Sequence, residues 1–305
     1  MRWLRGLLLA LRLFLLLGLL VVVGLFALPA TEFGSRLLVQ GAAWALEEAG
    51  LAQIEVQRVE GRLLGRLSLH GFALRESGAD GPAMLQAGRF TLHWDPVALF
   101  DGLLHLRTVE AFDVRVELPQ TQDEEPAAAP QIPDIALPLR VRLDRLELRR
   151  LELADAGGGW TLDRLALGLD LGHERLRLRD LDLAAMGASL SGALEMAAVA
   201  PHRLDGNLRI GADSRLTGAE IGRVKAGLTL SGPALKPTLD LRLQAPQQLR
   251  VQGDLVLDQA QPGFDLVAEW ERLGWPMHGE PAYRATDGRL RLDGTAADYR
   301  LALDA

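Results

Sequence analysis

The chain has 305 residues, no cysteine and a formal net charge of −7 at pH 7. The acidic balance, with no basic stripe set apart from balancing acids, excludes a reader of nucleic-acid backbones. The lack of cysteine excludes disulfides, thiolate metal sites and cysteine nucleophiles. Apolar residues reach 49% but aromatic residues only 5%, so leucine, valine and alanine fill most apolar positions and predict a smooth surface with few anchors.

Residues 1–30 predict a transmembrane signal anchor. From Leu7 to Leu28 the chain is apolar except for Arg12, and as a helix this run would span roughly 33 Å, enough for the core of a bilayer. Because the arginines lie at its start, the positive-inside rule keeps the N-terminus cytoplasmic and delivers the rest across the membrane. The residues that we assign to the anchor are Arg2, Arg5, Arg12, Leu13, Leu20 and Leu28.

A cleaved signal peptide is the alternative for this segment. The uninterrupted apolar part, from Leu13 to Leu28, is short, and small residues lie close to its end. The apolar region as a whole is longer than that of a usual signal peptide, which favours the uncleaved anchor.

Residues 31–50 predict one amphipathic helix. Thr31 or Ser35 can cap its start, Phe33, Leu37 and Trp44 lie on one apolar side, and a glycine at position 50 suits the residue after its end. Two placements remain open: the helix closes the end of a β-core, or it lies at the outer face of the membrane.

Residues 51–118 predict the first segment of an antiparallel sheet. Apolar and polar residues alternate with the period of half-buried strands, so residues on the polar phase, such as Thr91, are expected to face water. Gly71, residues 76–82 and Asp101-Gly102 are turn signals, which predict hairpins between neighbouring strands. The residues that share the apolar phase, and that we expect to form one wall, are Leu67, Leu69, Phe90, Leu92, Leu104, Leu106, Val114 and Val116.

Residues 119–138 interrupt this pattern, with five prolines, several alanines and the acidic run Asp123–Glu125. This composition predicts a solvated loop between two sheet segments. Over residues 139–305 the alternation resumes, and where it slips, as between Leu143 and Leu146, we expect a β-bulge. The predicted hairpin turns of this part are Gly157–Gly159, Asp205–Asn207, Ser231–Pro233 and Asp287-Gly288. The chain stops directly after a predicted strand, and we expect the native chain to continue.

No pattern of residues indicates catalysis. The sequence contains no nucleophile elbow, no P-loop and no dinucleotide fingerprint, and the six histidines never fall at the spacing of a zinc helix. The stretch Gly187–Gly192 contains serines but indicates a hairpin, and acids that alternate with arginines indicate ion pairs on a wet face. We therefore expect no catalytic residue, no metal site and no cofactor, and an anchored hydrolase is a remote reading.

Several stretches carry a resemblance to a known family. Gly61–Leu69 and Gly88–Gly102, and later Phe264–Pro276 and Gly288–Gly294, resemble the N-terminal region of the TamB family, the AsmA-like inner-membrane subunits of the translocation and assembly module. The resemblance implies a single-pass inner-membrane protein of the Gram-negative envelope, whose periplasmic bulk is a long curled β-sheet with an apolar groove. The family is linked to outer-membrane protein and autotransporter assembly, with an outer-membrane barrel partner, TamA, and to phospholipid transport between the two membranes. The C-terminal domain that contacts the barrel partner in that family has no counterpart in these residues.

Two functions remain open at this point. In the first, the apolar face is a groove that conducts phospholipid acyl chains. In the second, the same face is the core of a β-sandwich scaffold that binds an envelope partner by strand addition. Alternation of period two cannot separate them, because a sandwich core and a groove wall have the same pattern.

Overall fold

The computed structural model describes residues 31–48, 52–76, 84–117, 132–134, 139–155, 158–259, 261–295 and 297–304. The predicted anchor, residues 1–30, lies outside these ranges, as does most of the predicted loop of residues 119–138. Within the described ranges, no helix is long and apolar enough to cross a membrane.

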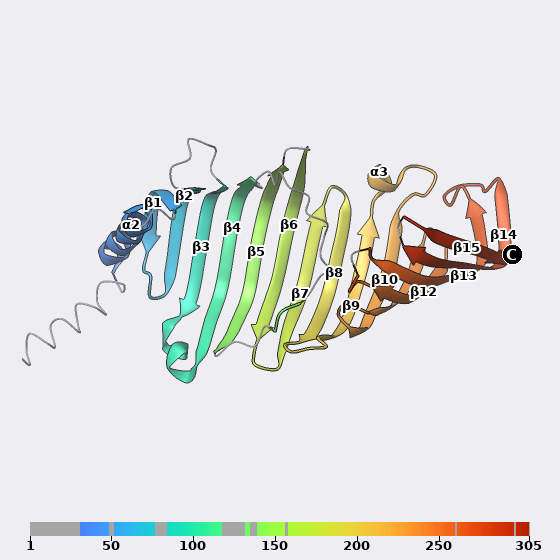
Figure 1. Cartoon of the computed structure of the whole chain (residues 1–305). Coiled ribbons are helices and arrows are strands. Elements are labelled where there is room, and N and C mark those ends of the chain that lie inside the picture. The colour runs from blue at the N-terminus through green and yellow to red at the C-terminus, as the bar shows by residue number, and fades with distance from the viewer. Residues whose placement is uncertain are drawn as a thin grey trace, which may run out of the picture.

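The protein is mainly β, and the strands of its described residues form one sheet of 15 strands (Figure 1). The order in the sheet equals the order in the chain, so β1 and β15 are the two edges and the sheet does not close. The strands are β1 (Ala52–Gly61), β2 (Arg66–Glu76), β3 (Leu85–Asp95), β4 (Leu103–Glu117), β5 (Arg140–Asp155), β6 (Gly158–Leu171), β7 (Arg175–Ala185), β8 (Ala188–Ala197), β9 (Arg203–Ala212), β10 (Val224–Pro233), β11 (Thr238–Ala245), β12 (Leu249–Val256), β13 (Gly263–Trp275), β14 (Tyr283–Thr295) and β15 (Tyr299–Asp304). The helices within the described ranges are α2 (Glu32–Glu48), the 3-10 helix η1 (Pro96–Asp101) and the four-residue α3 (Ser214–Thr217).

One neighbouring pair departs from the antiparallel pattern. β4 and β5 run parallel, in register from Leu103 with Arg140 to Glu117 with Ala154. Parallel neighbours need a connection that returns along the whole strand, and the stretch of residues 118–139 provides that length. Its described part, residues 132–134, contacts the turn between β8 and β9, where both ring nitrogens of His202 meet carbonyl oxygens, of Ile132 at 3.0 Å and of Ala197 at 3.1 Å.

Helix α2 confirms the helix predicted over residues 31–50 and packs at the β1 end of the sheet (Figure 1). Thr31 caps it, since its hydroxyl accepts a hydrogen bond from the backbone N–H of Gly34. The buried hydroxyl of Ser35 accepts the N–H of Leu63 at 2.7 Å. Phe33 is 72% exposed, so that part of the predicted apolar side does not face the sheet. The side chain of Trp44 lies outside the described residues.

Two creases cross the strands and shift their alternation by one residue. Along the first, Gly71, Asp113 and Arg150 have positive φ, and Asp113 and Arg150 form an ion pair at 2.6 Å. The second is a row of bulges, one of them between Leu143 and Leu146, which confirms the bulge predicted there. Each crease lets odd-numbered residues on one side of it share a face with even-numbered residues on the other.

Three turn predictions were wrong, two of them because turns and creases use the same residue types. Gly71 lies inside β2, Gly206 lies inside β9, and Asp287 lies inside β14 with a φ of 53°. Glycine and aspartate both tolerate positive φ, which serves a crease as well as a hairpin. The 3-10 helix η1, capped by Asp95, was not predicted either, although Asp95-Pro96 is a typical helix start.

Candidate functional site: the apolar face of the sheet

The pairing register places the eight predicted wall residues on one face. Cross-strand partners lie on the same side of a sheet, and Leu67 pairs with Leu92, as Leu69 does with Phe90. Phe90, Val114 and Val116 belong to one packed cluster around Ala87 and Ala111. Leu106 pairs with Leu143, and Leu104 pairs with Val141. The first segment of the sheet thus has a single apolar wall.

The sequence reasoning missed the middle of this wall. Ala111 and Val109 have odd numbers, whereas Leu106 and Val114 on the same strand have even numbers, yet all four lie on the apolar face. Val109 pairs with Leu92, which identifies its side. Along β4 the apolar residues change from even to odd numbers and back again, and this change was the signal that could have revealed the middle of the wall.

The wall continues across the sheet as an unbroken row of apolar side chains, which we call the apolar row. Each member pairs directly with the next across neighbouring strands, from β1 to β12. The row consists of Val59, Leu69, Phe90, Ala111, Leu148, Leu165, Leu183, Leu190, Ile210, Ala226, Leu243 and Leu249. At a strand spacing of about 4.8 Å it follows the sheet for roughly 50 Å.

Among the described residues, no second layer of strands covers the apolar face. All described strands belong to the one sheet, and Figure 1 shows it as a long twisted layer. Of the row, Val59 and the two alanines are fully buried, whereas its large members, such as Phe90, Leu165 and Leu190, keep part of their surface exposed. In a sandwich, such residues would meet an opposite sheet and lose that exposure. The described residues are therefore arranged as an open wall.

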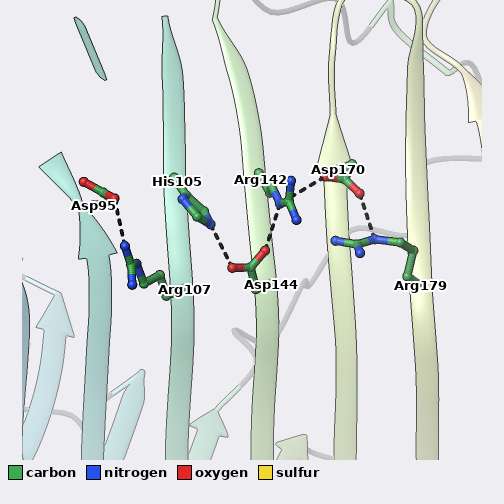
Figure 2. Close-up of polar contacts among 7 residues, drawn as sticks. All are labelled: Asp95, His105, Arg107, Arg142, Asp144, Asp170 and Arg179. Carbon is green, nitrogen blue, oxygen red and sulfur yellow. Dashed lines mark hydrogen bonds and ion pairs between the residues drawn. The ribbon is translucent and has the colours of Figure 1, made fainter. Parts of the chain in front are cut away.

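The opposite face carries ion pairs. Figure 2 shows a chain of them that runs from β4 to β7, beside a separate pair of Asp95 and Arg107. In the chain, His105 contacts Asp144 at 2.8 Å, Asp144 accepts from Arg142 at 2.9 Å, Arg142 lies 4.0 Å from Asp170, and Asp170 contacts Arg179 at 2.7 Å. Desolvation raises the pKa of Asp144, but hydrogen bonds from His105 and Arg142 outweigh it and leave that pKa below its ordinary value. The alternating acids and arginines of the sequence thus form a polar surface behind the apolar wall.

Part of the polar face is covered by its own side chains, contrary to the expectation for Thr91. Thr91 is only 3% exposed, and its hydroxyl lies 3.3 Å from that of Ser68. Glu147, 4% exposed, is bound by Arg145 and Arg149. The hydrogen bond from Arg149 is the main cause that holds the pKa of Glu147 below its ordinary value, against the opposing effect of burial. On this sheet, a residue at a polar position of the alternation is therefore not always exposed to water.

Among the described residues, no group of three or more histidines, acids or cysteines is placed to hold a metal ion. Two of the histidines, His70 and His105, contact the carboxylates of Glu60 and Asp144. What the geometry presents instead is a long apolar surface that is open to a ligand.

Comparison with known proteins gives one match. No curated protein and no solved structure matches the chain. The family described as "TamB, N-terminal domain" matches residues 19–191 and residues 120–305. The two matches overlap and together cover nearly the whole chain, in agreement with the resemblance carried by Gly61–Leu69 and Gly88–Gly102. The chain therefore belongs to the family of TamB N-terminal domains.

Proposed function

We propose that this protein carries phospholipid acyl chains along the apolar row, as a groove between the inner and outer membranes. The apolar row is the observation that supports this function. It presents only aliphatic residues and one phenylalanine across twelve neighbouring strands, and its large members remain partly exposed. A surface of this kind binds acyl chains without selecting for their length, since burial of apolar surface is non-directional.

The proposal includes the location of the protein. Residues 1–30 anchor it in the inner membrane with the N-terminus in the cytoplasm, and the sheet stands in the periplasm. The composition of residues 7–28 and the arginines before them support this orientation. The anchor places the β1 end of the sheet next to the membrane from which a lipid would enter.

A role in outer-membrane protein and autotransporter assembly is the second part of the proposal. Membership of the family of TamB N-terminal domains favours it. The edge of a sheet that does not close can pair with a further strand of a partner. Contact with a TamA-like outer-membrane barrel would use parts of a longer chain. The protein acts in both parts without catalysis.

Site-specific photo-crosslinking tests the lipid groove. Benzoylphenylalanine is placed at Phe90, Leu165 or Ile210, three points along the apolar row, and in matched controls at Arg89, Arg164 or Arg209, the preceding residue on the opposite face. After illumination of cells, the full-length protein is purified and its adducts are identified by mass spectrometry. We expect phospholipid adducts at the three row positions and none at the three controls.

The positions at which lipid adducts form distinguish the lipid groove from the scaffold function. Adducts at neither set of positions, in a protein that is folded and in the membrane fraction, would leave the scaffold function as the better reading. Equal adducts at both sets would mean that the protein lies against a bilayer rather than holding lipid on one face.

A further inference from the structure

A short helix with exposed apolar side chains stands at one edge of the sheet. It is η1, which connects β3 to β4, and none of its residues is buried. Phe100 is 85% exposed, Val97 is 67% exposed, and Leu99 is exposed as well. We call these three residues the apolar tip. Large apolar side chains that are exposed together on one turn mark a site of contact with another apolar surface.

Hydrogen bonds at both ends of η1 hold the tip to the sheet. At its start, the carboxylate of Asp95 accepts the N–H of Val97 at 3.2 Å. At its end, Gly102 has a φ of 66° and donates its N–H to the carbonyl of Leu99 at 3.0 Å. The carbonyl of Gly102 accepts the N–H of Arg140, the first residue of β5. The exposure of the tip thus belongs to a turn that is fixed at both ends.

Residues 1–30, the predicted anchor, join the described structure at the same edge. They lead into α2, where the hydroxyl of Ser35 in the first turn accepts the N–H of Leu63 at 2.7 Å. Leu63 lies in the hairpin between β1 and β2, and its carbonyl accepts the indole N–H of Trp94 at 2.6 Å. The backbone N–H of Trp94 donates to Gly65 of that hairpin at 3.0 Å. Because Trp94 precedes η1 by two residues, these contacts link the start of α2 to the base of the tip.

Three arginines beside the tip are exposed and have no carboxylate partner among the described residues. Arg62 lies in the hairpin that contacts Trp94, Arg66 is the first residue of β2, and Arg140 is the first residue of β5. The register places Arg66 and Arg140 on the polar face, where that face meets this edge. Asp101, exposed at the end of η1, is the opposing charge on the tip itself. Basic residues beside exposed apolar ones are typical of segments that lie in the surface of an anionic membrane.

We propose that the apolar tip enters the surface of an anionic lipid bilayer, with its side chains below the headgroups and the three arginines at the lipid phosphates. The proposal rests on the location proposed above, because the bilayer is the one that holds residues 1–30. A bilayer that meets the sheet edge-on contacts side chains of either face near that edge. Phe33, exposed in the first turn of α2, adds an apolar side chain there. A single spanning helix leaves the sheet free to turn, and this second contact removes that freedom.

A single fluorescent label tests the contact, because the chain has no cysteine of its own. Val97→Cys carries the fluorophore NBD on the tip. The matched control is Leu216→Cys on α3, an exposed apolar residue of a short helix at the opposite edge of the sheet (Figure 1). The full-length protein is reconstituted in vesicles of phosphatidylethanolamine and phosphatidylglycerol that include a lipid with a nitroxide on its acyl chain. We expect the nitroxide to quench the label at position 97 and not the label at position 216.

Charge variants in the Val97→Cys protein test the arginines. The triple variant Arg62→Gln, Arg66→Gln, Arg140→Gln should lower the ratio of inserted to free tip, measured from the quenched fraction. We expect a decrease of about fivefold per arginine, which corresponds to about 1 kcal/mol for a basic residue near an anionic surface. The control removes the same charge from exposed arginines away from this edge and should leave the quenching unchanged. It is Arg209→Gln, Arg223→Gln, Arg284→Gln.

The outcomes separate the tip from the anchor. Quenching at neither position, or equal quenching at both, in a protein that stays with the vesicles would overturn the contact of the tip alone. A protein that does not stay with the vesicles would overturn the proposed location and this contact with it. A label at position 97 that is shielded from aqueous iodide but not quenched by the nitroxide would show that protein covers the tip, which also overturns the bilayer contact. Quenching that is unchanged in the Arg62/Arg66/Arg140 variant would overturn the role of the arginines.

Discussion

Replacing Leu190 by aspartate tests whether the apolar face is open. Leu190 lies near the middle of the apolar row, pairs with Leu183 and Ile210, and keeps part of its surface exposed. Full burial of a leucine side chain is worth about 1.5 to 3 kcal/mol. Since Leu190 is only partly buried and water can reach a carboxylate there, we expect a loss of about 1 to 2 kcal/mol. For a chain of this size, that lowers the melting temperature by about 1.5 to 3 °C.

Ser189 provides the matched control for Leu190→Asp. It precedes Leu190 on the same strand, is exposed on the opposite face, and can receive the same charge as Ser189→Asp. Thr91 would not serve as a control of this kind, because it is buried. Circular dichroism and thermal melting of the full-length protein measure both variants, and photo-crosslinking at Ile210 measures lipid on the row. We expect both variants to fold, with lipid adducts lost only in Leu190→Asp.

A covered face would behave differently. Burying an unpaired carboxylate between two layers exceeds the usual range of single substitutions and unfolds most domains. Global unfolding of Leu190→Asp beside a folded Ser189→Asp would therefore refute the open wall and the groove function derived from it.

Three further predictions concern contacts away from the row. Glu147→Gln should cost about 1.5 to 3 kcal/mol by denaturant unfolding, whereas Glu152→Gln, in an exposed pair with Arg115, should cost under about 1 kcal/mol. The folded-state pKa of Glu147 lies below its ordinary value of 4.5, so the stability that its carboxylate adds is complete above pH 4.5 and is lost as the pH falls through the folded-state pKa. In Glu147→Gln, the melting temperature should therefore depend less on pH below pH 4.5 than it does in the unchanged protein. Ser35→Ala removes the acceptor of the Leu63 N–H and should release α2 by about 1 to 3 kcal/mol, seen as faster hydrogen exchange in α2, while Gln40→Ala on its exposed side should change nothing. His202→Leu removes the two ring nitrogens that lie 3.0 Å from the carbonyl oxygen of Ile132 and 3.1 Å from that of Ala197, so proteolysis near residues 132–134 should accelerate. Unchanged cleavage would mean that His202 does not hold this segment.

The alternation of Leu67, Leu69, Phe90 and Leu92 was sufficient to predict both the strands and their common face. It was sufficient because period two is a local property of an extended backbone. The same reasoning placed Leu104, Leu106, Val114 and Val116 correctly, although two creases lie between these pairs on β4. It did so because each crease shifts the alternation by one residue, and two such shifts restore the original alternation of apolar and polar residues. Val109 and Ala111, which lie between the creases, were therefore missed.

The remaining features depend on contacts that a single sequence does not show. In the sequence, Asp287 fits a turn and a crease equally well. The structure shows a crease, because β14 continues on both sides of Asp287. The parallel pairing of β4 and β5 depends on where the connection of residues 118–139 leads. The burial of Thr91 depends on neighbouring side chains of the polar face.

The identity of chain order and sheet order has a consequence for how the protein unfolds and evolves. Each strand pairs only with the strands before and after it, so stability is close to a sum of nearest-neighbour terms, as in solenoid proteins. Damage to β14 would loosen β13 and β15 and leave β1 to β8 nearly unaffected. By the same logic, inserting one hairpin would lengthen the sheet by two strands, roughly 10 Å, without repacking anything else. Such a sheet can be matched to the distance that it must span by the number of its hairpins alone.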